Sequence, residues 1–333
     1  MSDEPETIVA IAPGEPLPSW CRPQWDVLAA RAANGTLPHA LLLCGPAGLG
    51  KRALAEAFAR ARLCQEPCNG IACGHCRACK LLAAGTHPDR MLVTLEINPK
   101  TGVLRKEIVI DQVRALSARL AMASQLDGWQ VAVIDPAELM NPAAQNALLK
   151  TLEEPTDSSL IVLVADQPWR LSATIRSRCQ RIDFAVPSPA EALEWLASRG
   201  VAGSAEALLA AAGGNPGQAW LLAERGGMQR RQDVARDILA LASGRGDARA
   251  IARAWAEDEP AQRLEQAARL LEGSLRTRAA GQRPRFDPGW DDEVLAAQFA
   301  AANRLRILLN GPLRADLALF HWLDGLSTAG VDA

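Results

Sequence analysis

Short apolar runs alternate with segments of helical periodicity between residues 41 and 184. The runs that predict strands occupy residues 41–44, 91–95, 131–134, 160–164 and 180–184. Strands that alternate with helices are typical of a parallel sheet whose strands are joined by crossover helices. The pattern therefore predicts an α/β domain in the first half of the chain.

Polar residues and prolines predict where helices begin and end. Asn141 can cap a helix whose first residue is Pro142, since a proline there loses no hydrogen bond, and Pro155 ends that helix. Asp111 is expected to cap a helix whose apolar residues recur every three to four positions over residues 113–120.

The chain after residue 184 predicts helices alone. Ser188, Pro189 and Glu191 form a capping-box pattern at the start of the first one, and the sequence GGNPG at 213–217 interrupts the helical stretch. The apolar faces of two later helices are Leu264, Ala268, Leu271 and Leu275, and Leu295, Phe299, Ala302 and Leu309. We predict an α/β domain over 1–186, a small helical domain over 187–227 and a C-terminal helical domain over 228–333.

Composition narrows the class of protein. The 333 residues are 49% hydrophobic and carry 36 Lys+Arg against 38 Asp+Glu, which indicates a folded protein and argues against binding nucleic acid by bulk positive charge. No apolar run approaches the ~18 residues that cross a bilayer. The N-terminal sequence MSDEPETIVA is acidic and does not resemble a secretion signal. We expect a cytoplasmic protein that does not contact membranes.

A glycine-rich segment between the first strand and the next helix resembles a phosphate-binding loop. Gly45, Gly48, Gly50 and Lys51 stand at the positions whose backbone N–H groups and ammonium would surround phosphate oxygens. The next residue should be Ser or Thr to ligate Mg²⁺, but it is Arg52, which cannot coordinate a cation. The alternative is a glycine-rich turn that binds nothing.

The residues that follow the strand predicted at 131–134 resemble a second part of a nucleotide site, the one that carries acidic side chains. Asp135 follows the strand as a candidate carboxylate near Mg²⁺, but Pro136 takes the place of the glutamate that activates water in hydrolysing proteins. Glu138 stands further on and can point elsewhere. The structural alternative is that Asp135 only caps the next turn.

Five of the eight cysteines lie within residues 64–79. Four have the spacing C-x8-C-x2-C-x2-C, which suits tetrahedral Zn²⁺, and they are Cys64, Cys73, Cys76 and Cys79. Cys68 and His75 compete as ligands, and an iron–sulfur cluster or free thiols are the alternatives. Because four protein ligands leave no open position, such a zinc ion would be structural.

Arg178 lies just before the last predicted strand, between Ser177 and Cys179. An arginine at the rim of an α/β domain is suited to reach a phosphate on a neighbouring subunit. A single arginine in a loop there is more often a surface residue, and Arg176 and Arg181 compete for the role.

Together these segments resemble the delta-prime subunits of the bacterial DNA polymerase III clamp loader, which are AAA+ proteins. The matching stretches are GPAGLGKR, the cysteine module, GTHPD at 85–89, NALLKTLEEP at 146–155 and ATIRSRC at 173–179. The resemblance is dense over about residues 20–185. It implies a five-stranded AAA+ domain, a helical lid and a helical collar through which subunits form a ring.

The resemblance also implies roles for residues. It makes the four cysteines the zinc ligands and Arg178 an arginine finger that acts in trans on ATP held by an adjacent subunit. Hydrolysing relatives carry a sensor arginine at the place of 215–217, where this chain has none. Together with Arg52 and Pro136 this implies no hydrolysis, while the retained Lys51 leaves ATP binding open.

The function implied is that of a non-hydrolysing ring member. Its partners would be gamma/tau and delta subunits, contacted through the collar, with the sliding clamp and primed DNA in the assembled hetero-oligomer. The alternative is an active clamp-loader ATPase of the gamma/tau type. A third interpretation, a zinc-dependent DNA-binding module, depends on the cysteines and on Arg230, Arg231, Arg276 and Arg278.

Overall fold

The computed structural model describes residues 17–126, 128–201, 203–224, 227–309 and 313–329. Contacts divide the chain into two compact units. The first comprises the described residues up to Ser198 and the segment Asn215–Gln218, and the second comprises Arg199–Gly214 and the described residues from Ala219 onward. The finer division into three domains stays a prediction.

The first unit contains a five-stranded parallel sheet in the order β2-β3-β4-β1-β5. The strands are β1 (Ala40–Cys44), β2 (Arg90–Val93), β3 (Gln130–Ile134), β4 (Ser159–Ala165) and β5 (Gln180–Asp183). Each lies within two residues of its predicted bounds. The predicted α/β fold with five parallel strands is confirmed.

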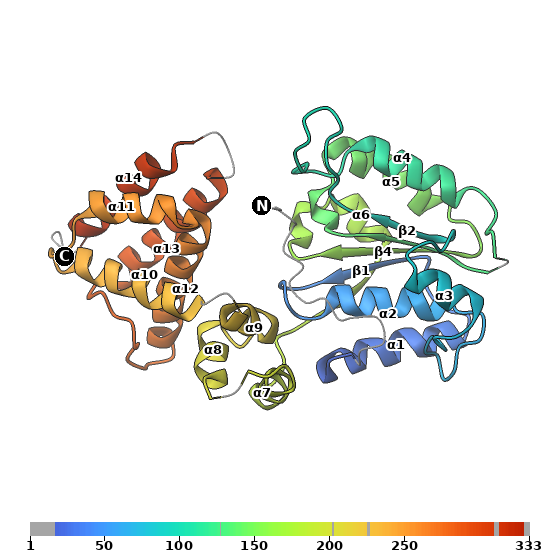
Figure 1. Ribbon diagram of the computed structural model, residues 1–333, viewed down its shortest axis with the longest axis horizontal. Helices are drawn as coiled ribbons and strands as arrows, with labels where there is room; N and C mark the ends of the chain where they lie inside the picture. Colours follow the sequence, from blue (N-terminus) through green and yellow to red (C-terminus); the bar gives the residue numbers. More distant parts are fainter. Residues whose placement is uncertain (1–16, 127, 202, 225–226, 310–312, 330–333) are drawn as a thin grey trace. The chain divides into compact units, whose positions relative to one another are not determined.

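Helices cover both faces of this sheet (Figure 1). One face carries α1 (Arg22–Ala33), α2 (Lys51–Leu63) and α3 (Arg77–Ala83). The other carries α4 (Ile110–Leu120), α5 (Pro142–Glu153) and α6 (Ala173–Arg178). Three short 3-10 helices are η1 (Ser19–Cys21), η2 (Ala137–Leu139) and η3 (Pro168–Arg170).

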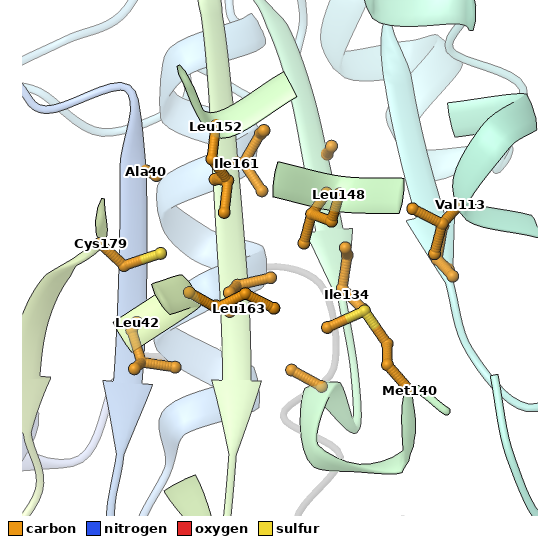
Figure 2. Packing of buried hydrophobic residues seen from close by; sticks show 14 of the residues in the cluster. Ala40, Leu42, Val113, Ile134, Met140, Leu148, Leu152, Ile161, Leu163 and Cys179 are labelled. Carbon is orange, nitrogen blue, oxygen red and sulfur yellow. The ribbon is translucent and has the colours of Figure 1, made fainter. Parts of the chain in front are cut away.

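The central strands are buried on both faces, which explains their continuous apolar sequences. In β1, Leu41 and Leu43 pack toward α1 and α2, whereas Ala40 and Leu42 pack toward α4, α5 and α6. Figure 2 shows the second of these cores, with Leu42 and Leu163 on adjacent strands. Each fully buried leucine contributes about 1.5–3 kcal/mol, so the sheet fixes the positions of the loops at its edges.

The predicted helix caps are confirmed with one exception. Asn141 Oδ1 accepts the N–H of Ala144 at 2.9 Å, as expected for the start of α5. The expected capping of α4 by Asp111 is wrong, because the helix begins two residues earlier than that cap requires and the N–H of Val109 donates to Gln112 Oε1 at 3.0 Å. Asp111 lies instead in the first turn, where a negative charge favours the helix dipole.

Helix α7 (Pro189–Ser198) completes the first unit and has the predicted capping box. The later helices are α8 (Ala205–Ala211), α9 (Pro216–Glu224), α10 (Gly227–Ala242), α11 (Ala248–Glu257), α12 (Pro260–Ala279), α13 (Asp292–Leu308) and α14 (Ala315–Thr328). The two predicted apolar faces of α12 and α13 lie in one hydrophobic core of the second unit. Within the described parts of the chain, every helix is too short or too polar to span a bilayer.

Candidate functional site

The glycine-rich loop connects the end of β1 to the start of α2, as predicted. Its glycines have positive φ angles of 144° at Gly45, 89° at Gly48 and 87° at Gly50, a conformation that other residues adopt only with strain. At Gly45 a Cβ atom would lie 2.4 Å from the carbonyl oxygen of Phe184. The backbone of this loop therefore requires glycine at these positions, as the predicted phosphate-binding pattern has them.

The lysine of this loop is directed into the protein itself. Lys51 is 3% exposed, and its Nζ donates to the carbonyl oxygens of Gly45 at 2.6 Å and Pro46 at 2.7 Å. It also forms an ion pair with Asp166 Oδ1 at 2.6 Å. An ammonium group has three N–H donors, and these three acceptors use all of them. No donor of Lys51 is left for a phosphate.

Arg52 fills the place where a nucleotide site would bind Mg²⁺. Its Nε lies 2.7 Å from Asp135 Oδ2, and both side chains are mostly buried. Burial raises the pKa of the Asp135 carboxyl even though Arg52 lowers it, because desolvation of the charge outweighs the attraction. Asp135 is therefore paired with Arg52 through Oδ2.

The third carboxylate of the region also bonds within the chain. Glu138 Oε1 accepts the backbone N–H groups of Asp166 at 3.0 Å and Gln167 at 3.3 Å, just after β4. Burial raises its pKa. Pro136 takes the position of the usual glutamate, and Glu138 bonds to the loop after β4.

The last three residues of the GGNPG sequence, which belong to the first unit, lie directly on the glycine-rich loop. Asn215 is buried, and its Nδ2 donates to the carbonyl oxygen of Ala47 at 2.8 Å while its Oδ1 accepts the N–H of Gln218 at 3.1 Å. A Cβ atom at Gly217 would lie 2.3 Å from the carbonyl oxygen of Gly48. Any larger side chain at Gly217, a sensor arginine included, would clash with the backbone of Gly48 in this arrangement.

The four predicted metal ligands come together between the end of α2 and the first turn of α3, which contains Cys79. Their sulfur atoms all lie within 4.8 Å of one another. Two Sγ–Sγ distances, 3.8 Å for Cys64–Cys76 and 3.9 Å for Cys73–Cys79, match the edge of ~3.8 Å that a tetrahedron with 2.3 Å Zn–S bonds would have. The cluster can hold a metal ion.

Backbone N–H groups support these sulfur atoms, as the spacing suggested. The N–H of Cys73 donates to Cys64 Sγ at 3.3 Å, and that of Cys76 donates to Cys73 Sγ at 3.4 Å. Of the competing candidates, Cys68 is exposed and lies beside a turn, away from the group of four. His75 stays a candidate, because its ring and the Glu66 carboxylate lie within 4.8 Å of the Cys73 sulfur and of each other, although both are exposed.

Arg178 is the last residue of the short helix α6 and not a loop residue. Its Nη2 lies 2.6 Å from Glu153 Oε1, and its Nη1 donates to the carbonyl oxygen of Thr174 at 3.1 Å. The side chain is 34% exposed. Of its two competitors, Arg181 pairs with Asp183 of its own strand and Arg176 is fully on the surface.

Other candidate residues have structural roles. In GTHPD, the buried carboxylate of Asp89 accepts the N–H groups of Gln125 and Leu126, so this motif fixes the connection before β3. Three of the four arginines proposed for DNA binding pair with carboxylates of the second unit, and they are Arg230, Arg276 and Arg278. Their charges are compensated, which argues against a phosphate-binding face.

Sequence reasoning missed two residues of the site. Asp166 follows β4 directly, and its place at the carboxyl end of a parallel strand is a signal that it lies near the loop after β1. Glu153 lies in the sequence LEEP, which was recognised only as a motif. Its contact with Arg178 joins positions 25 residues apart, which no local pattern reveals.

The family model described as "DNA polymerase III, delta subunit" matches residues 21–188. DNA polymerase III subunit delta′ of Pseudomonas aeruginosa is 43% identical over 239 residues, which are 71% of this chain and 70% of that relative. Subunit delta′ of Escherichia coli is 37% identical over 296 residues, 87% of this chain and 85% of the relative. Subunit tau of Bacillus subtilis is 34% identical over 146 residues, 44% of this chain and 24% of that protein.

The family model covers half of the chain, and the two delta′ relatives are each covered over more than two thirds of their length. The range that the family model matches contains the glycine-rich loop, the thiol cluster and Arg178 as well as the sheet. The chain belongs to the family of delta-prime subunits of DNA polymerase III.

Proposed function

We propose that this chain is a non-hydrolysing subunit of a clamp loader and supplies Arg178 to the ATP site of a neighbouring ATPase subunit. The observation that carries the proposal is the contrast between Lys51, whose three donors are all used within the chain, and Arg178, which presents donors at the surface. The chain would then be catalytic only across a subunit boundary.

Electrostatics at the glycine-rich loop support the absence of hydrolysis. The cations Lys51 and Arg52 are compensated by carboxylates of Asp135 and Asp166, and Glu138 adds a third acidic group. A nucleotide triphosphate would bring several negative charges to a site without free positive charge. It would also have to break these buried ion pairs, each costly to separate.

Arg178 can act on a phosphoryl group through its guanidinium. This group stays charged at all physiological pH values and donates in a planar fork that matches phosphate oxygens. In phosphoryl transfer such an arginine stabilises the charge that develops on the γ-phosphate and contributes about 10³–10⁵-fold to the rate.

The partners we propose follow from membership of the family. They are gamma/tau and delta subunits, contacted through a C-terminal collar over residues 228–333, with a lid over 187–227 between collar and AAA+ domain. The assembled hetero-oligomer would act in the cytoplasm on the sliding clamp and primed DNA.

We propose that the thiol cluster holds zinc as a structural ion. Four thiolates fill a tetrahedral site, so no position remains for a catalytic water. Metal analysis of the purified chain should give about one zinc per chain for the wild type and for Cys68→Ser, and a loss of zinc for Cys79→Ser. A metal-free wild-type chain would rule out this assignment.

Replacing Arg178 tests the proposed role in a complex reconstituted with gamma/tau and delta subunits. We expect Arg178→Ala to lower ATP hydrolysis at the neighbouring site by about 10³-fold, while Arg176→Ala, on the same helix, leaves the rate unchanged. The isolated chain should hydrolyse no ATP in any form. Unchanged activity of the Arg178→Ala complex would refute the role, and hydrolysis by the isolated chain would favour an active ATPase of the gamma/tau type.

A further inference from the structure

Arg178 does not extend freely from the surface but is held by an ion pair with a neighbouring helix. We infer that Glu153 is a positioning residue for Arg178, which fixes the orientation of the guanidinium before a neighbouring subunit docks. The inference deepens the proposed function and rests on it. Its basis is the 2.6 Å contact between Arg178 Nη2 and Glu153 Oε1.

The backbone on both sides of this ion pair is fixed by buried neighbours. Glu153 ends α5 directly after Leu152, which is 2% exposed, and Arg178 ends α6 directly before Cys179, which is 9% exposed. Both buried side chains belong to the same hydrophobic core and are labelled in Figure 2. The two helix ends therefore hold the charged groups at a constant separation.

The hydrogen bonds of Arg178 leave part of the guanidinium for another acceptor. The group has five N–H donors. One on Nη1 is used by the carbonyl oxygen of Thr174 and one on Nη2 by Glu153. Among the described residues the other three N–H donors have no acceptor, and two anchors determine the plane in which they lie. That arrangement suits an acceptor with several oxygens, such as a phosphoryl group.

The ion pair is partly exposed, so Glu153 can orient the arginine without cancelling its positive charge. The Glu153 side chain is 49% exposed and that of Arg178 is 34% exposed, so water screens their attraction. An unanchored arginine would sample many rotamers, and ordering it on docking would cost conformational entropy. Glu153 imposes much of that order in advance, as preorganised catalytic groups require.

Glu154 provides a matched control. It is the next residue, it carries the same charge, and it is exposed at the end of α5, where its backbone N–H donates to Lys150. Within the described residues its side chain forms no ion pair with Arg178. Substituting it removes the same charge from the same surface without removing the anchor.

The test measures ATP hydrolysis by the reconstituted complex containing Glu153→Ala, Glu153→Gln or Glu154→Ala. We expect Glu153→Ala to lower kcat about three- to tenfold with the KM for ATP unchanged. Glu153→Gln keeps an acceptor oxygen and should recover part of the rate, and Glu154→Ala should match the wild type. In an Arg178→Ala background, Glu153→Ala should have no further effect, because its role passes through the arginine.

Two results would overturn the inference. One is an unchanged or increased kcat for Glu153→Ala, and the other is an equal loss in the Arg178→Ala background, which would indicate a general structural effect. Thermal denaturation of the isolated variants identifies any misfolding. If Arg178→Ala itself has no effect, the proposed function fails; if it lowers the rate while Glu153→Ala does not, only the positioning role fails.

Discussion

The loop lysine, Lys51, and the rim arginine, Arg178, differ in how many of their N–H donors are bonded within the chain. At the loop, Lys51 is 3% exposed and every donor of its ammonium group bonds to an acceptor of the same chain. At the rim, Arg178 is anchored at two N–H groups and has donors to spare. The loop lysine is thus bound within its own chain, whereas the arginine keeps donors that the proposed function assigns to a neighbouring subunit.

This comparison predicts that substitutions in the two regions affect different properties. Loop residues should change the stability of the first unit and have no direct effect on trans-acting catalysis. Substituting Arg178 should lower trans-acting catalysis and have little effect on the stability of the first unit.

The largest effect on stability is expected for Lys51→Ala. Removing the buried ammonium leaves the Asp166 carboxylate and two carbonyl oxygens without their donor, which should cost about 3 kcal/mol or more. For a unit of this size that lowers the melting temperature by about 6–12 °C. Lys150→Ala, which removes an exposed lysine of α5, should leave the melting temperature unchanged within ~2 °C. Equal stability of the two variants would mean that Lys51 is not held as described.

A smaller loss is expected for Gly217→Ala. The new Cβ would lie 2.3 Å from the carbonyl oxygen of Gly48, so the two backbones must separate, at a cost of about 1–3 kcal/mol. Gly273→Ala is the matched control, since its Cβ meets no atom within 4 Å and alanine favours the helix interior by about 1 kcal/mol. Thermal denaturation should show opposite signs, and a stabilising Gly217→Ala would disprove the close approach.

The smallest effect on stability is expected for Arg178→Ala. Its ion pair with Glu153 is partly exposed, and such pairs contribute about 0.2–1 kcal/mol. The melting temperature of the isolated chain should therefore change by no more than ~4 °C, although ATP hydrolysis by the complex falls steeply. A large destabilisation would show that the arginine belongs to the folded structure in the same way as Lys51.

The sequence predicted those features that depend on residues close to one another along the chain. Continuous apolar runs located all five strands, because strands buried on both faces need them, and the cysteine spacing located four sulfur atoms that the turns bring together. The cap of α4 was mispredicted because Asp111 and Gln112 are adjacent polar residues that can both bond to the start of a helix. Which of them does so depends on the residue at which the helix begins.

The contacts that define the site could not be predicted in this way. The ion pair of Lys51 and Asp166 joins the first residue of α2 to the residue after β4, and the bond from Asn215 to Ala47 spans 168 positions. Both depend on the order of strands in the sheet and on where the chain returns to the loop. The sequence therefore indicated that the loop lacks catalytic groups but not that its lysine is already bound.

The central claim is that the glycine-rich loop neither binds nor hydrolyses a nucleotide. The most direct test titrates the isolated chain with ATP and Mg²⁺, measuring binding by calorimetry and hydrolysis by the release of inorganic phosphate. With the donors of Lys51 bound internally, no saturable binding and no phosphate release should occur up to millimolar ATP. Saturable, magnesium-dependent binding that Lys51→Ala abolishes would contradict the account, because it would mean that the loop opens to admit a nucleotide.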